Sequence, residues 1–243
     1  MSKQYQSPLR VVLLAAGQGK RMKSQLPKVL HPVLGKAILA RILDAVDELG
    51  AEHVHIVVGH GADQVRTFLE ANPPKTPWST HLQEPQLGTG HALMQVSPDL
   101  KSFKGTLLVS VADAPLLSAP ALSSLVDAHQ KETATLSLLT TVVEDPRSYG
   151  RIVRGSDGKV ERIVEDKDAS QSQKEIREIN PAIYCFEWPA VEPGLACLGN
   201  DNNQKEYYLT DLLAWASKGK MKIADAVCAD WREVSGINSR VEL

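Results

Sequence analysis

Two glycines followed by a group of cations open the loop in the stretch VVLLAAGQGKRMKSQLPKVLHPVLGK, residues 11–36. An apolar run ends at Gly17, and Gly19 comes two residues later. The cations that follow are Lys20, Arg21, Lys23 and Lys28. Glycines leave backbone N–H groups open to a ligand, and Lys and Arg side chains neutralise phosphate charge. The stretch therefore predicts a cradle for several phosphates.

Two common phosphate-binding motifs do not fit this stretch. A dinucleotide fingerprint needs a third glycine where the chain has Met22, and Pro27 and Pro32 prevent a regular helix from starting within the glycines. A Walker A loop needs Ser or Thr where the chain has Arg21. A glycine pair alone would equally suit a flexible surface loop with solvated charges.

A carboxylate at Asp113 is the second group that could do chemistry. It ends the apolar run TLLVSVAD (106–113), at the expected carboxyl end of a buried strand. Open α/β sheets bind ligands at that edge, and a carboxylate oxygen there suits Mg²⁺. A helix cap or a turn would be the alternative role for a lone Asp.

Continuous apolar runs supply the elements that must position these groups. They cover 11–17, 53–59, 106–113 and 136–143, and they predict central parallel strands that are buried on both faces. Segment 36–50 carries a helical apolar stripe and ends at Gly50, and 62–71 and 120–131 suggest further helices. The alternation predicts an α/β fold with a doubly wound, mostly parallel sheet.

The chain becomes richer in short β segments after about residue 145. Ser156-Asp157-Gly158 predicts the turn of a β-hairpin. Segment 178–186 reads as one strand, 206–219 as a helix and 222–227 as a final strand.

Composition excludes several classes of partner. The 243 residues carry a net charge of −2, so no basic excess is available to neutralise a nucleic-acid backbone. No apolar run approaches the roughly 18 residues of a membrane span, and no signal-peptide core is present at the N-terminus. We expect a cytoplasmic protein with neither nucleic-acid nor membrane partners.

Cysteine and histidine spacing predicts no zinc site. Cys185, Cys197 and Cys228 are odd in number and far apart, which argues against a disulfide framework and against thiolate metal ligands. His53 and His55 share one face of a strand, but no third ligand follows at a metal-type spacing.

A longer match extends the opening motif. LLAAGQGKRMKSQLPKVLHPVLGK resembles the L-x-A-G-x-G-T-R-M…P-K signature of the sugar-1-phosphate nucleotidyltransferases, with Lys20 where that family usually has Thr. The closest resemblance is to the uridylyltransferase domain of the bifunctional N-acetylglucosamine-1-phosphate uridylyltransferases. Further segments resemble family motifs in the family's order: QEPQLGTGHA (83–92), YGRIVR (149–154), IVEDKDAS (163–170), EINPAIY (178–184), EYYLTDLLAWA (206–216) and SGINSR (235–240).

The resemblance implies a reaction and a set of site residues. The reaction is Mg²⁺-dependent attack of N-acetylglucosamine 1-phosphate on UTP, which releases pyrophosphate. The implied catalytic residues are Arg21, Lys28 and Asp113, and the implied Mg²⁺ ligands are Asp113 and Asn238. The implied nucleotide contacts are Leu14, Ala15, Ala16, Gly17, Lys28, Gln83, Gly88 and Thr89, and the implied sugar contacts are Ala112, Gly150, Glu165 and Asn180.

The implied roles agree with the chemistry of the side chains. Arg21 and Lys28 suit the triphosphate and the departing pyrophosphate, and the Gln83 amide suits uracil, which presents both donors and acceptors. We expect 1–243 to form a single nucleotidyltransferase domain. Residues from about 8 to 145 would bind the nucleotide. Residues from about 146 to 243 would form a small β-rich sugar-binding lobe and would bring the metal ligand Asn238 back to the nucleotide site.

Two departures from the family leave alternatives open. Val111-Ala112 replaces Tyr-Gly, and Pro181-Ala182 replaces Thr-Gly, both on the expected sugar side. The chain could therefore act on a different sugar 1-phosphate, or it could be a non-catalytic regulatory protein that binds nucleotide sugars. The hexapeptide-repeat β-helix of the bifunctional relatives is absent, so we expect no acetyl transfer and a monomer.

Overall fold

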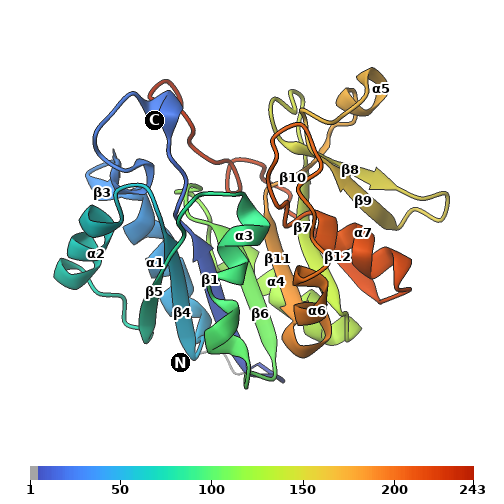
Figure 1. The fold of residues 1–243 in the computed structure, drawn as a ribbon, viewed down its shortest axis with the longest axis horizontal. Coiled ribbons are helices and arrows are strands. Elements are labelled where there is room, and N and C mark those ends of the chain that lie inside the picture. The colour runs from blue at the N-terminus through green and yellow to red at the C-terminus, as the bar shows by residue number, and fades with distance from the viewer. Residues whose placement is uncertain (1–4) are drawn as a thin grey trace.

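A mostly parallel sheet with helices on both faces forms the body of the protein in the computed structural model, which describes residues 5–243 (Figure 1). Within these residues ten strands form one sheet, in the order β5-β4-β1-β6-β11-β7-β10-β8-β9, with β12 paired to β7. The strands are β1 Leu9–Leu14, β4 His53–Val58, β5 Trp78–Leu82, β6 Thr106–Val111, β7 Leu136–Val142, β8 Gly150–Arg154, β9 Val160–Val164, β10 Glu178–Asn180, β11 Ile183–Glu187 and β12 Ile223–Val227. A separate pair joins β2 Pro32–Val33 to β3 Lys36–Ala37.

Side chains that alternate along β1 enter two different hydrophobic cores. Val11 and Leu13 pack in the core beneath one group of helices, and Val12 packs in the core on the other face. The first group is α1 Ile38–Leu49, α2 Ala62–Ala71 and α4 Ala119–Glu132. The second face carries α3 Thr89–Met94, α6 Trp188–Leu195 and α7 Asp211–Lys218. The predicted doubly wound α/β fold is confirmed.

Strands β5, β4, β1 and β6 run parallel, so their carboxyl ends meet at one edge of the sheet. Leu14 of β1 pairs in register with Val57 of β4 and with Val111 of β6. The residues that follow these strands leave the sheet at this edge, with only single bonds such as Ala112 N to the Leu14 carbonyl (3.1 Å). Gly17 and Asp113 therefore lie in loops beyond the strands rather than within them.

Strand β7 is a central strand with the same direction as β6, as predicted, and β12 pairs with it in parallel. β11 and β10 also pair with β7, both antiparallel. β11 pairs antiparallel with β6 as well, so it is inserted between β6 and β7. The sequence did not predict this insertion, because an apolar run indicates burial on both faces and does not give the direction of a neighbouring strand.

The sequence predicted the helices on one face of the sheet well, namely α1, α2 and α4. It predicted those on the other face poorly. α2 has the predicted limits, and α1 ends at Gly50, whose φ of 75° is the left-handed conformation expected of a helix-ending glycine. Sequence periodicity did not predict β2, β3, β5, α3, α6 and the short α5 Gln171–Lys174. All of these are short, and short elements carry too few repeats for a clear period.

The β-rich part contains the predicted hairpin and two corrections. β8 and β9 pair antiparallel, and Gly158 occupies the turn with φ 78°. The segment read as one strand is split into β10 and β11 at Pro181–Ala182. The helix expected from 206 begins only at Asp211, because backbone groups of Tyr207 bond to the Leu87 carbonyl and the Gly90 amide instead.

Ala182 has a φ of 61°, a left-handed conformation that disfavours a Cβ atom. We expect Ala182→Gly to stabilise the protein by about 1 kcal/mol and to raise Tm by about 2–4 °C. Thermal unfolding followed by circular dichroism measures this. Ala224→Gly in β12 is the matched control, and it should lower Tm because a glycine in a regular strand loses more chain entropy on folding. A lower Tm for Ala182→Gly would show that the left-handed backbone at residue 182 is not strained by the alanine side chain.

Candidate active site

A cavity of about 520 Å³ lies at the carboxyl edge of the parallel strands, and we call it the loop cavity. Its walls come from the ends of β1 and β6, from the glycine loop and from the start of α3. Eleven predicted site residues line it: Leu14, Ala15, Ala16, Gly17, Arg21, Lys28, Gln83, Gly88, Thr89, Asp113 and Asn238. The fold therefore brings together residues that lie more than 200 positions apart in the sequence.

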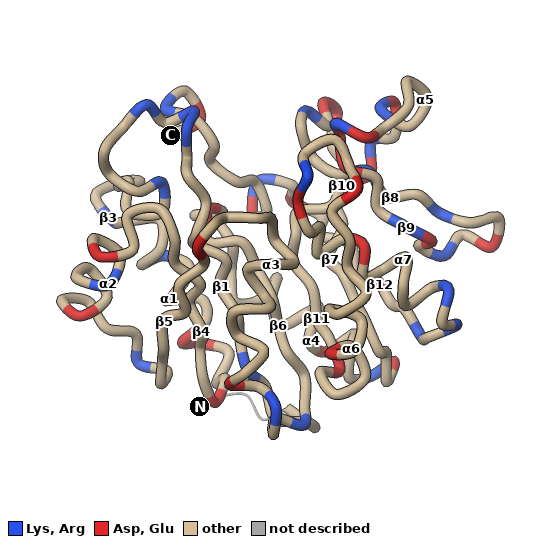
Figure 2. Tube along the Cα trace, viewed as in Figure 1, with Lys and Arg blue, Asp and Glu red and all other residues tan. Residues whose placement is uncertain are grey.

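The glycine loop is compact, because it folds back on itself. Gly19 has φ 55°, and a Cβ on it would lie 3.0 Å from the Lys28 Cβ, so a glycine lets the two ends of the loop touch. Met22 is buried and anchors the loop, while Lys20 and Arg21 remain exposed. In Figure 2, Lys and Arg positions gather along this loop beside the C-terminus. The predicted phosphate cradle thus has a defined shape and a positive rim.

Lys28, Asp113 and Asn238 form a cluster on one wall of the loop cavity. The Lys28 ammonium pairs with the Asp113 carboxylate and donates to Asn238 Oδ1 at 3.1 Å. The Lys28 and Asp113 side chains are 14% and 15% exposed. Two hard oxygen atoms thus converge on one cationic group, and Mg²⁺ prefers such oxygen donors. The donor set fits the predicted metal, which Asp113 and Asn238 would hold.

The segment around Gly236 fixes the Asp113 carboxylate. Ile237 N donates to the Asp113 carbonyl at 2.9 Å, and Gly236 N donates to the Tyr149 hydroxyl at 2.9 Å. A Cβ on Gly236 would lie 2.9 Å from Asp113 Oδ1, so a larger residue would displace the carboxylate. Burial raises the pKa of Tyr149, which keeps its hydroxyl neutral. Sequence reasoning missed both Tyr149 and Gly236, although each lies in a quoted motif.

Gln83 is buried at the far side of the loop cavity, just after β5. Its amide nitrogen donates to the Gly88 carbonyl at 2.9 Å and to His91 Nδ1 at 3.2 Å. No other residue in 5–243 donates to its amide oxygen, which is thus available to a ligand N–H group. Gly88 has φ 102°, and a Cβ there would lie 2.7 Å from the Tyr207 carbonyl oxygen. Only glycine fits at that position.

A second cavity of about 190 Å³, the lobe cavity, adjoins the first. It contains the predicted sugar contacts Gly150, Glu165 and Asn180. Five residues line both cavities: Leu14, Thr89, Val111, Asp113 and Asn238. The two cavities therefore meet at the pair of oxygen donors, Asp113 and Asn238.

Ala112 is the predicted sugar contact that the structure places elsewhere. Its side chain is fully buried in the core and lines neither cavity. Its φ is not positive, so alanine costs no backbone strain where the family has glycine. Val111 lies at the junction of the two cavities instead.

Glu165 is the polar centre of the lobe cavity. Burial raises the pKa of its carboxyl, while a hydrogen bond from the Thr210 hydroxyl (3.1 Å) opposes that rise. Asn180 Nδ2 donates to the Tyr184 hydroxyl at 2.7 Å, and its Oδ1 accepts from Ala182 N at 3.0 Å. A carboxylate and an amide held in this way can bind hydroxyl and N–H groups. Sequence reasoning missed Thr210, because its partner Glu165 lies 45 residues away. It also missed Tyr184, although Tyr184 lies only four residues from its partner Asn180.

No helix among residues 5–243 has both the length and the apolar character needed to cross a bilayer.

Comparisons with known proteins agree with this architecture. Residues 11–204 match the family model of the MobA-like NTP transferase domain. The bifunctional protein GlmU of Brevibacillus brevis is 44% identical over 237 residues, 98% of this chain and 50% of that protein. The GlmU of Syntrophotalea carbinolica is 46% identical over 235 residues, 97% of this chain and 50% of that protein. The chain thus spans about half the length of these curated relatives.

Solved structures show the same fold at low sequence identity. A UDP-glucose pyrophosphorylase in complex with UDP-glucose superposes with a TM-score of 0.74 and 21% identity over 89% of each chain. A glucose-1-phosphate thymidylyltransferase from Bacillus anthracis, described as putative, gives 0.73 and 16% identity over 96% of this chain and 92% of that one. The sheet order, the cavity at its carboxyl edge and the match over residues 11–204 lead to one conclusion: the chain belongs to the MobA-like NTP transferase domain family.

Proposed function

We propose that the chain is a Mg²⁺-dependent nucleotidyltransferase that converts UTP and N-acetylglucosamine 1-phosphate into UDP-N-acetylglucosamine and pyrophosphate. One observation carries the proposal: the loop cavity, with its cations, meets the lobe cavity, with its carboxylate and amide, at Asp113 and Asn238. Two substrates bound side by side would have their reacting phosphates at that junction. The similarity to GlmU proteins supports the choice of substrates.

The residues of the loop cavity would act by positioning and by neutralising charge. The reaction joins two anions and releases a third, so groups placed in advance lower the barrier. Arg21 would hold the triphosphate through its forked donors, and Lys28 would follow the departing pyrophosphate as a mobile charge. Mg²⁺, when bound at Asp113 and Asn238, would neutralise developing charge on phosphoryl oxygens. No covalent enzyme intermediate is required.

Base selection would rest on Gln83. Uracil has an N3–H group flanked by two carbonyls, and the amide oxygen of Gln83 offers an acceptor for that group. The bond from its amide nitrogen to Gly88 holds the side chain in this orientation. The backbone of residues 14–17 and of Gly88 and Thr89 would supply further polar groups.

The lobe cavity would bind the sugar. Glu165 and Asn180 would bind its hydroxyl and acetamido groups there.

The reaction would take place in the cytoplasm. Cys185, Cys197 and Cys228 are all free thiols, which agrees with a reducing cytoplasm. UDP-N-acetylglucosamine made there would feed cell-envelope synthesis.

A substrate panel tests the function. Purified protein is incubated with UTP, Mg²⁺ and the 1-phosphates of N-acetylglucosamine, glucose, galactose or N-acetylgalactosamine, and pyrophosphate release is followed. We expect the highest kcat/KM with N-acetylglucosamine 1-phosphate and a loss of turnover when EDTA removes the metal. Faster turnover of another sugar would correct the substrate. Tight UTP binding without pyrophosphate release for any sugar would support a regulatory binding protein instead.

A further inference from the structure

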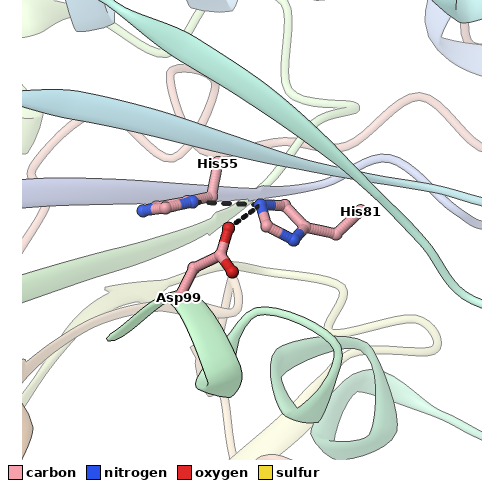
Figure 3. Close-up of side chains that lie close together, drawn as sticks. All are labelled: His55, His81 and Asp99. Carbon is pink, nitrogen blue, oxygen red and sulfur yellow. Dashed lines mark hydrogen bonds and ion pairs between the residues drawn. The ribbon is translucent and has the colours of Figure 1, made fainter. Parts of the chain in front are cut away.

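We propose that His55, His81 and Asp99 form a binding site for a transition-metal dication such as Zn²⁺, separate from the loop and lobe cavities. Their ligand atoms all lie within 4.8 Å of one another. Figure 3 shows the two imidazole rings and the carboxylate directed toward one another. Residue spacing predicted no zinc site here, because His81 and Asp99 lie far along the chain from His55.

The fold brings the three residues together from three elements. His55 is on β4, and its register partner on the edge strand β5 is Ser79. His81 lies two residues further along β5, so its side chain points to the same face of the sheet. Asp99 comes from the short 3-10 turn η3 Ser97–Leu100, which packs on that face.

The distances are close to those of a four-coordinate metal centre. His55 Nδ1 and His81 Nε2 are 3.0 Å apart, and His81 Nε2 and Asp99 Oδ2 are 3.9 Å apart. A tetrahedron with metal–nitrogen bonds of about 2.0–2.1 Å has edges of about 3.3 Å, so small side-chain movements suffice. The Ser79 hydroxyl lies 3.2 Å from His55 Nδ1 and 3.0 Å from His81 Nε2, beside the place of a fourth ligand.

The protonation state and the access of the site suit metal binding. Burial lowers the pKa of His55 to about 3 and lowers that of His81, so both rings are neutral at pH 7, as metal ligands must be. Within residues 5–243, His55 Nε2 has no hydrogen-bond partner, which leaves Nδ1 as the atom that faces the cluster. The Asp99 side chain is 58% exposed and gives an ion a path from solvent.

The charges around the cluster favour some metals over others. Arg10 faces it from β1, with its guanidinium over the Phe103 ring and a 3.5 Å bond to the Asp99 carbonyl. His53 stands beside His55 with ring centroids 4.5 Å apart, and its pKa is also lowered by burial. Asp99 is thus the one carboxylate in the candidate set, opposite one guanidinium. Two nitrogen ligands with little net charge select Zn²⁺, Ni²⁺ or Cu²⁺ and reject Mg²⁺.

Zinc titration in excess Mg²⁺ tests the site, because Mg²⁺ would occupy the position proposed for it at Asp113 and Asn238. Calorimetry on the full chain should show one Zn²⁺ per molecule, and Zn²⁺ should raise Tm. His81→Gln and Asp99→Asn should each weaken binding by more than about tenfold. His60→Gln, which replaces an exposed histidine outside the cluster, should bind as the unaltered protein does. Asp99 is on the surface, so Asp99→Asn gives a readable result even if His81→Gln folds poorly.

Two results would overturn the metal site. One is the absence of zinc binding to the unaltered protein in excess Mg²⁺, which would leave the cluster as hydrogen-bonded histidines only. The other is unchanged affinity in both variants, which would place the zinc at another position such as the exposed Cys197 thiol. Intense visible bands on Co²⁺ addition, lost in both variants, would confirm four-coordinate binding. None of these measurements uses nucleotidyl transfer, so the result does not depend on the proposed function.

Discussion

Replacing Asp113 by Asn should lower kcat/KM for UTP and N-acetylglucosamine 1-phosphate by about 10³-fold. The variant keeps the shape of the side chain but loses the charge that pairs with Lys28 and that would hold Mg²⁺. Asp113 also stands where the two cavities meet, so its loss affects both substrates. Initial rates of pyrophosphate release at several Mg²⁺ concentrations measure the effect.

The matched control for this prediction is Asp201→Asn. Asp201 is fully exposed, and it forms a surface ion pair with Lys205, four residues away. Such pairs contribute little to stability, so the control should keep full activity. If Asp113→Asn retained activity within about threefold of the unaltered protein, Asp113 could not be the metal ligand. An unchanged Mg²⁺ dependence would lead to the same conclusion.

Replacing Lys28 by Ala should lower kcat by about 10²–10³-fold and, at the same time, increase the stabilisation by Mg²⁺. The Lys28 ammonium contacts both the Asp113 carboxylate and Asn238 Oδ1. Its removal abolishes the charge proposed for the departing pyrophosphate. It also leaves a largely buried carboxylate without its cation, and Mg²⁺ can then bind without displacing the lysine.

Both effects of Lys28→Ala are measurable on one preparation. Pyrophosphate release gives kcat, and thermal unfolding at increasing Mg²⁺ gives the metal-dependent rise in Tm. Lys36→Ala is the control, because Lys36 pairs with Asp44 in an exposed ion pair outside the cavities. It should change neither quantity. A smaller Mg²⁺-dependent rise in Lys28→Ala than in the unaltered protein would contradict competition between the lysine and the metal.

Local sequence determined much of the fold in the N-terminal part of the chain. Strands β1, β4 and β6 follow from continuous apolar runs and α1 from an apolar stripe, because burial and helical period are properties of neighbouring residues. The segments expected as further helices are α2 and α4. The family motifs also named eleven of the residues that line the loop cavity, from Leu14 to Asn238. Their roles in catalysis remain predictions that the variants above would test.

The tertiary structure decided what depends on pairs of residues far apart. Strand β11 is inserted antiparallel between β6 and β7, and Ala112 faces the core. Neither feature is visible in a local pattern. Tyr149 and Gly236 fix Asp113 through contacts that span 87 and more than 100 residues. His55, His81 and Asp99 meet for the same reason: strand register and the packing of η3 set their distances. Sequence determines which groups are present and which segments are buried. Chain folding alone brings distant polar atoms within bonding distance of one another.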